Sequence, residues 1–167
     1  MFDMKNRFYF LIITILLTSC EIQYGMIDQS IDAETFSVQQ FEELAPNAPA
    51  GYGAIYTDFL KDYLISRTKL NLKNSDADID IIGKITDFNT SSISVQADES
   101  AALNRLTITL MVTAINNKNE DQSFEASFTQ FSDYSSDQDL SSVQDALIDD
   151  INDKLSQDIV NRLTSNW

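Results

Sequence analysis

The sequence has 167 residues, a formal net charge of −15, no histidine and a single cysteine. This acidity argues against nucleic acid as a ligand, because nucleic-acid binding needs a basic surface. The lack of histidine removes the commonest general base and metal ligand, and one cysteine cannot form an internal disulfide.

Residues 1–19 have the parts of a secretion signal. A short basic region with Lys5 and Arg7 precedes an apolar run from Phe8 to Leu17, which ends at Thr18-Ser19-Cys20. Signal peptides have apolar cores of about 7–15 residues, whereas a membrane-spanning helix needs roughly 20 apolar residues. The sequence therefore predicts a cleaved signal peptide over residues 1–19.

The four residues Leu17-Thr18-Ser19-Cys20 resemble the bacterial lipobox. By that resemblance, cleavage falls before Cys20, whose thiol takes a diacylglyceryl group and whose new amino terminus is acylated. Two or three acyl chains hold a protein firmly on a membrane, whereas one chain anchors only marginally. The alternative is an ordinary signal peptide that happens to end near a cysteine.

Without its signal, the mature chain has the size of one domain. It loses Asp3, Lys5 and Arg7, so its 148 residues include 25 acidic and 9 basic side chains, a formal charge of −16. Residues 20–33 are interpreted as a lipidated tether that leads into one folded domain over residues 34–167.

The first predicted elements of the domain are a strand and a helix. From Glu34 to Phe41, apolar residues alternate with polar neighbours, and this period of two predicts a strand. Residues 42–50 contain both prolines and are expected to form a loop. From Gly51 to Arg67 the apolar spacing is helical, and we expect the following stripe to lie opposite Lys61 and Asp62: Ile55, Phe59, Tyr63 and Leu64.

A long strand region is predicted next. Apolar residues alternate there with aspartates, which are expected to form a solvated face: Ala77, Ile79 and Ile81 against Asp76, Asp78 and Asp80. Gly83 is expected to mark a bulge, and the strand to continue through Ile85 toward Val95. A calcium loop would need glycine and glutamate at its sixth and twelfth positions, where this chain has Ile81 and Asp87.

The clearest predicted strand runs from Ala101 to Asn116. One face is apolar, with residues at every second position: Leu106, Ile108, Leu110, Val112 and Ala114. The other face is rich in threonine, which has a high strand propensity: Thr107, Thr109, Met111 and Thr113. A turn at residues 116–119 leads to a returning strand over Ser123–Tyr134.

The last predicted element is a helix from Ser142 to Leu163. Apolar residues recur every four positions, and Ile148 and Val160 widen the stripe: Val143, Leu147, Ile151, Leu155, Ile159 and Leu163. Ser141 followed by Gln144 predicts a capping box. The many aspartates of this helix are interpreted as a solvated face and not as a metal site.

Together these elements predict an α+β fold. The expected architecture is a two-layer sandwich, in which one four-stranded, mostly antiparallel sheet carries two helices on one face. The sequence contains no glycine-rich phosphate loop, no nucleophile elbow and no cysteine–histidine pair. We therefore assign no catalytic residues and no metal ligands.

Arg105 opens the clearest strand and is a candidate binding residue. Its planar guanidinium suits a phosphate or a carboxylate ligand. The favoured alternative is an ion pair with a local acid, such as Asp98 or Glu99.

Several stretches of the chain together resemble LptE, the lipopolysaccharide-assembly lipoprotein family of the outer membrane. They are Phe36–Phe41, Arg67–Leu72, Ile82–Thr86 and Ala101–Ile108, with the last helix and the terminal Asn166-Trp167. No single motif is specific, and the order of the stretches along nearly the whole chain carries the resemblance. The family's fold, two helices on a four-stranded sheet, agrees with the predicted elements.

The resemblance implies a non-enzymatic role without a cofactor other than the covalent lipid on Cys20. Members of the family sit as a plug inside the large β-barrel LptD, help that barrel to fold, and have been credited with binding lipopolysaccharide. The implied location is the periplasmic side of the outer membrane, held there by lipid. The implied partner is an LptD-type barrel.

The charge of this chain departs from what lipopolysaccharide contact would need. Lipopolysaccharide is polyanionic, so an acidic domain would need a basic patch whose members lie within a Debye length of about 8 Å. The candidate contacts with lipopolysaccharide or the barrel are Lys84, Arg105 and Lys118. The alternative function is a stand-alone periplasmic lipoprotein that carries an apolar or envelope ligand in a sizeable cavity.

Overall fold

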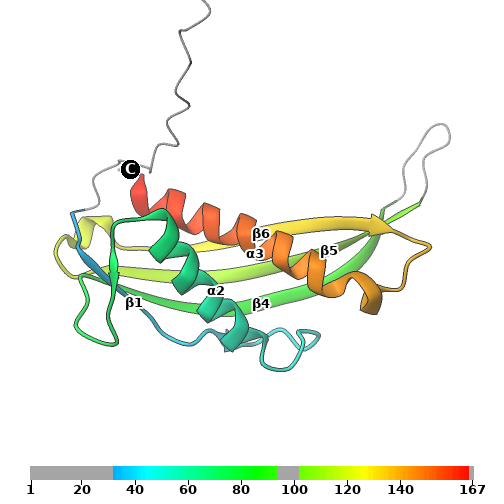
Figure 1. Ribbon diagram of the computed structural model, residues 1–167, viewed down its shortest axis with the longest axis horizontal. Helices are drawn as coiled ribbons and strands as arrows, with labels where there is room; N and C mark the ends of the chain where they lie inside the picture. The colour runs from blue at the N-terminus through cyan, green and yellow to red at the C-terminus, as the bar shows by residue number, and fades with distance from the viewer. Residues whose placement is uncertain (1–31, 94–101, 166–167) are drawn as a thin grey trace, which may run out of the picture.

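The three long strands that the sequence predicts lie next to one another in a sheet, with the last of them at its edge (Figure 1). The computed structural model describes residues 32–93 and 102–165. β4 (Ile79–Ile93), β5 (Leu103–Asn116) and β6 (Phe124–Ser135) pair as antiparallel neighbours along most of their lengths. A short 3-10 helix, η1 (Glu120–Gln122), follows the predicted turn between β5 and β6.

The α+β class and the two helices are confirmed, but the sheet is larger than predicted and mixed in direction. Within the described residues the sheet has six strands, because β1 (Thr35–Val38), β2 (Glu42–Glu43) and β3 (Asn71–Leu72) add to it. β1 runs parallel to both β3 and β4, and β2 runs parallel to β4. Strands of two residues show no alternation, so no periodicity could predict β2 or β3.

The predicted strand Glu34–Phe41 is interrupted because Phe41 turns its ring onto Gly83 of β4. A Cβ atom on Gly83 would lie between 2.0 and 2.4 Å from three atoms of that ring, so only glycine leaves enough space. The buried ring also stands edge-on to Tyr56, with centroids 5.0 Å apart. The expected bulge lies elsewhere in β4, where the register shifts between Ile85 and Asp87.

α2 (Tyr52–Arg67) confirms the predicted helix but buries a different side of it. The core-facing residues are spaced by four: Tyr52, Tyr56, Leu60 and Leu64. Of the predicted stripe only Leu64 is buried, and Ile55 is 58% exposed. The two tyrosine rings can lie inside because their hydroxyl groups find partners on the second helix.

α3 (Leu140–Thr164) confirms the predicted repeat, since Leu147, Ile151, Leu155 and Ile159 are all buried. The predicted capping box is wrong, because the helix begins two residues early and its N-cap is Asp139, without a side-chain cap. A second and partly polar stripe is buried beside the predicted one: Ile148, Asn152, Ser156 and Val160.

Both helices pack on one face of the sheet (Figure 1). α3 lies over β6 and β5, and α2 contacts β2, β3 and α3. The sheet residues under the helices form the helix-covered face, which on β5 is fully buried: Leu106, Ile108, Leu110 and Val112. The alternate residues of β4, β5 and β6 form the open face, on which no helix of the described chain lies.

Both ends of the described chain lie at one end of the sheet. β1 pairs with the start of β4, through Phe36 and Ile79. Near the end of α3, Arg162 lies 5.4 Å from the ring centroid of Phe124, which begins β6. We call this the anchor end, because the chain from the tether joins the domain there. β4 reaches Ile93, about 45 Å away at about 3.3 Å per residue.

Candidate functional site

The centre of the open face is rich in hydroxyl groups on β5 and β6, and Lys84 and Asp87 of β4 lie beside it. Thr109 and Thr129 lie opposite each other on β5 and β6, with their hydroxyl oxygens 3.0 Å apart. The apolar side chains interspersed there are partly exposed, and Phe131 is 42% exposed opposite Thr107. This surface can exchange hydrogen bonds with water or with a polar partner over the length of three strands.

Arg105 is held rigidly on the open face, near the end away from the anchor end. Its Nε and Nη2 donate to Oδ1 and Oδ2 of Asp133 at 2.7 and 2.9 Å. Its guanidinium carbon lies 3.5 Å from the ring centroid of Phe131, a cation–π contact. The hydrogen bonds from Arg105 lower the pKa of Asp133.

The partner of Arg105 could not be predicted from nearby positions in the sequence. The expected acids, Asp98 and Glu99, lie outside the described residues. Within the described chain, the register of β5 against β6 places Arg105 opposite Asp133, which is 28 residues away. The favoured hypothesis, an ion pair between Arg105 and an acid, is therefore confirmed. The acid is Asp133 and not one of those expected, and only the pairing of the strands identifies it.

The three candidate cations do not gather into one basic patch. Lys84 lies opposite Met111 on the open face, six residues along β5 from Arg105, or about 20 Å. Lys118 lies beyond the end of β5, at the anchor end. These separations exceed a Debye length of about 8 Å, so the cations cannot act as one anion site.

Each lysine of the candidate set also faces a carboxylate. Lys84 Nζ lies 3.8 Å from an oxygen of Glu42, and Lys118 Nζ lies 3.2 Å from an oxygen of Asp78. A polyanion would have to compete with these acids for the same ammonium groups. Both lysines are already placed beside carboxylates of the chain itself.

Two of the aspartates in residues 76–80, Asp78 and Asp80, hold β1 in place, which corrects the prediction of a solvated face for them, whereas Asp76 is exposed. Asp78 Oδ2 accepts the backbone N–H groups of Glu34 and Thr35 at 2.8 and 3.0 Å. Asp80 Oδ1 accepts the hydroxyl of Ser37 at 2.5 Å. Hydrogen bonds with the backbone N–H of Glu34 first, and then with Lys118 and Thr35, lower the pKa of Asp78 to about 2. The run begins before the strand, since β4 starts only at Ile79.

Polar contacts between the two helices were not predicted. The hydroxyl of Tyr52 donates to Asn152 Oδ1 at 2.6 Å, and the hydroxyls of Tyr56 and Ser156 lie 3.4 Å apart. Burial raises the pKa of both tyrosines. Both pairs repeat at intervals of four on each helix, and this matched spacing is the signal that could have revealed them.

The described residues contain neither a group placed to hold a metal ion nor a helix that could cross a membrane. Among them, no three or more histidine, cysteine, aspartate or glutamate side chains are placed to hold a metal ion. In the same part of the chain, no helix is long and apolar enough to cross a membrane. Cys20, the predicted lipidation site, lies outside the described residues, as do Asn166 and Trp167.

A comparison with protein families finds a match over most of the chain. The model of the LptE family, described as lipopolysaccharide-assembly, matches residues 33–163. The matched range begins just before β1 and ends within the last turn of α3. No curated protein matches the chain.

Solved structures share the fold at low sequence identity. A minor lipoprotein from Acinetobacter baumannii has a TM-score of 0.53 and 14% identity, over 81% of this chain and 95% of that chain. A protein from Xanthomonas campestris has a TM-score of 0.54 and 13% identity, over 81% and 86%. A hypothetical protein from Chlamydia trachomatis has a TM-score of 0.51 and 12% identity, over 79% and 96%. At such identities the likeness shows the fold alone.

Proposed function

This chain belongs to the LptE family of lipopolysaccharide-assembly proteins, and we propose that it is the lipid-anchored plug of an LptD-type β-barrel in the outer membrane. In this proposal Cys20 carries the lipid on the periplasmic side of that membrane. The domain enters the barrel lumen and helps the barrel to fold. Its role is to fill and support the barrel, without chemistry of its own.

The open face is the observation that carries this proposal. The lumen of a large outer-membrane barrel is polar and water-filled, so a plug needs a surface that exchanges hydrogen bonds readily. The threonine hydroxyls at the centre of the open face, such as Thr109 and Thr129, meet that need. Among the candidate contacts, Arg105 and Lys84 lie on the same face and are proposed to meet the barrel wall.

The dimensions of the sheet also support the proposal. A length of about 45 Å along β4 exceeds the roughly 30 Å of hydrocarbon in a bilayer. The 14 residues of the tether, 20–33, reach at most about 45–50 Å when fully extended. A lipid in the inner leaflet would therefore let the domain enter the lumen with its Ile93 end leading and its anchor end in the periplasm.

The experiment that tests this function is a pull-down in mild detergent. The tagged, lipidated protein is isolated from outer membranes, and the proteins that come with it are identified and quantified by mass spectrometry. We expect a large β-barrel in a one-to-one ratio. Recovery of the lipoprotein alone, under conditions that keep other envelope complexes intact, would contradict the proposal and favour a free-standing carrier.

The lipid anchor has its own control in that experiment. The variant Cys20→Ala lacks the thiol that would accept the diacylglyceryl group. It should incorporate no labelled palmitate and should accumulate as precursor or in the soluble periplasmic fraction. Labelled palmitate on the variant would contradict the assignment of Cys20 as the lipidation site.

A further inference from the structure

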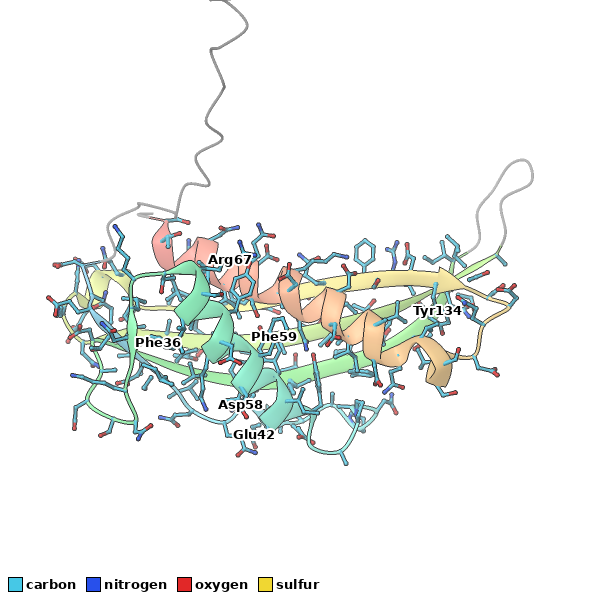
Figure 2. All side chains as sticks on the ribbon, in the orientation of Figure 1. Phe36, Glu42, Asp58, Phe59, Arg67 and Tyr134 are labelled. Atoms are coloured by element: carbon cyan, nitrogen blue, oxygen red, sulfur yellow. The ribbon has the colours of Figure 1, made fainter. Side chains whose placement is uncertain are left out.

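A row of side chains on one flank of α2 is only partly covered by the core. We call it the outer row, and its members recur every four residues: Ile55, which is exposed, Phe59 and Tyr63, which are partly buried, and the cation Arg67. The rings of Phe59 and Tyr63 stack with centroids 6.3 Å apart, and the guanidinium carbon of Arg67 lies 5.4 Å from the Tyr63 centroid. Figure 2 shows Phe59 and Arg67 on the flank of α2 that faces α3.

The outer row differs from ordinary surface apolar residues by its continuity. Single exposed apolar side chains are normal on soluble proteins, and Ile65 on another side of α2, 50% exposed, is one of these. The outer row instead spans twelve residue steps, about 18 Å of helix. Its stacked rings are already ordered, which lowers the entropy lost when a partner binds.

The neighbours of the outer row on α3 are acidic. Burial raises the pKa of the Tyr63 hydroxyl, the negative charge of Asp153 adds to this effect, and the positive charge of Arg67 opposes it. Asp149 lies one turn before Asp153 on α3, and both are exposed. A partner that covers the rings therefore also meets negative charge on the α3 side.

These features define the chemistry of the partner. A second copy of the mature chain would bring the same carboxylates and a formal charge of −16, so self-association is disfavoured. We propose that the outer row is the docking site for an amphipathic helix of another protein, whose apolar ridge is flanked by lysine or arginine. A ridge of about three turns matches the length of the row. This inference does not depend on the barrel partnership.

The test uses the full lipidated chain in phosphatidylcholine nanodiscs, with empty nanodiscs as the blank. The probe is a fluorescent helical peptide of about 18 residues, or five turns, with a leucine ridge flanked by lysines. A scrambled peptide of the same composition has equal charge but no ridge, and binding is followed by fluorescence anisotropy. We expect the amphipathic peptide to bind at least tenfold more tightly than the scrambled one.

Matched variants locate the site. Phe59→Ser and Asp153→Lys should each weaken binding about tenfold, whereas Ile65→Ser should leave it unchanged. All three positions are wholly or partly exposed, so the folded state of each variant can be verified by circular dichroism melting. Equal binding of the scrambled peptide, or an equal loss in Ile65→Ser, would overturn the proposal. The barrel pull-down is a separate measurement, so the failure of one proposal leaves the other standing.

Discussion

Neighbouring residues of β5 point into two different environments. Leu110 is fully buried on the helix-covered face, in one core cluster with residues of α2 and α3. Thr109, one position earlier, lies on the open face and meets the hydroxyl of Thr129. One strand therefore stabilises the fold with one set of side chains and presents the other set outward.

The difference between the two faces separates folding from recognition. Burial of apolar surface contributes about 25 cal/mol per Å², and on β5 nearly all of that area lies on the helix-covered face. The open face is not needed to form the core, so its threonines can suit a partner without a large cost in stability. Substitutions that distinguish the faces should therefore affect different measurements.

The largest expected effect is the contrast between Leu110→Ala and Thr109→Ala. Leu110→Ala leaves a cavity under the helices and should lower the free energy of unfolding by about 2–5 kcal/mol. Thr109→Ala removes strand propensity and one hydroxyl contact and should cost less than about 1 kcal/mol. Urea unfolding of the two variants gives both values, and equal losses would mean that the two faces are not distinct.

The second effect tests the close approach of Phe41 to Gly83. Gly83→Ala should lower the free energy of unfolding by about 1–3 kcal/mol, because the new methyl group displaces the ring. The same change in a Phe41→Leu background should cost less, because the ring is no longer there. A Gly83→Ala variant as stable as the parent would show that the ring can move without strain.

The third effect concerns recognition. Arg105→Glu places a second acid beside Asp133 on the open face, whereas Lys154→Glu changes a charge on α3, where Lys154 pairs with Asp150. If the open face meets the barrel, Arg105→Glu should reduce the level of assembled barrel several-fold more than Lys154→Glu. Barrel levels measured by immunoblot after heat-modifiability analysis test this, and equal levels would count against it.

The smallest effect is the pH dependence of the hydrogen bonds by which Asp78 holds β1 in place. The pKa of Asp78 is lowered to about 2 in the folded protein, so its contribution is present above its ordinary pKa of about 3.9 and disappears as pH falls through 2. Asp78→Asn should therefore be less stable than the parent at pH 7, and the difference should vanish near pH 2. A difference independent of pH would show that the carboxylate charge is not responsible.

Regular, long patterns made much of this fold predictable. The alternation in β5 and the four-residue repeat in α3 each continue along most of the element. Both patterns correctly predicted buried residues, such as Leu110 in β5 and Ile151 in α3. The two-residue strands β2 and β3 carry no such signal, and parallel pairing depends on contacts distant in sequence. For this reason the sheet is larger and more mixed in direction than predicted, whereas its long antiparallel strands are as predicted.

Side-chain partners were harder to predict than secondary structure. In α2 two apolar stripes lie side by side, and periodicity alone did not decide that Tyr56 is buried and Ile55 exposed. The pairing of Arg105 with Asp133 follows from strand register. Cys20 was assigned from a local motif, and its lipidation remains a prediction.

Site-specific photo-crosslinking from the open face is the most direct test of the central proposal. A photoreactive residue replaces Thr109 in the lipidated chain, and a matched variant carries it at Asp62, which is exposed on α2. After irradiation of intact cells, the account predicts an adduct between the Thr109 variant and a large outer-membrane barrel, in greater yield than from Asp62. No barrel adduct from Thr109, with the chain present in the outer membrane, would contradict the assignment of the open face as the barrel-contact surface.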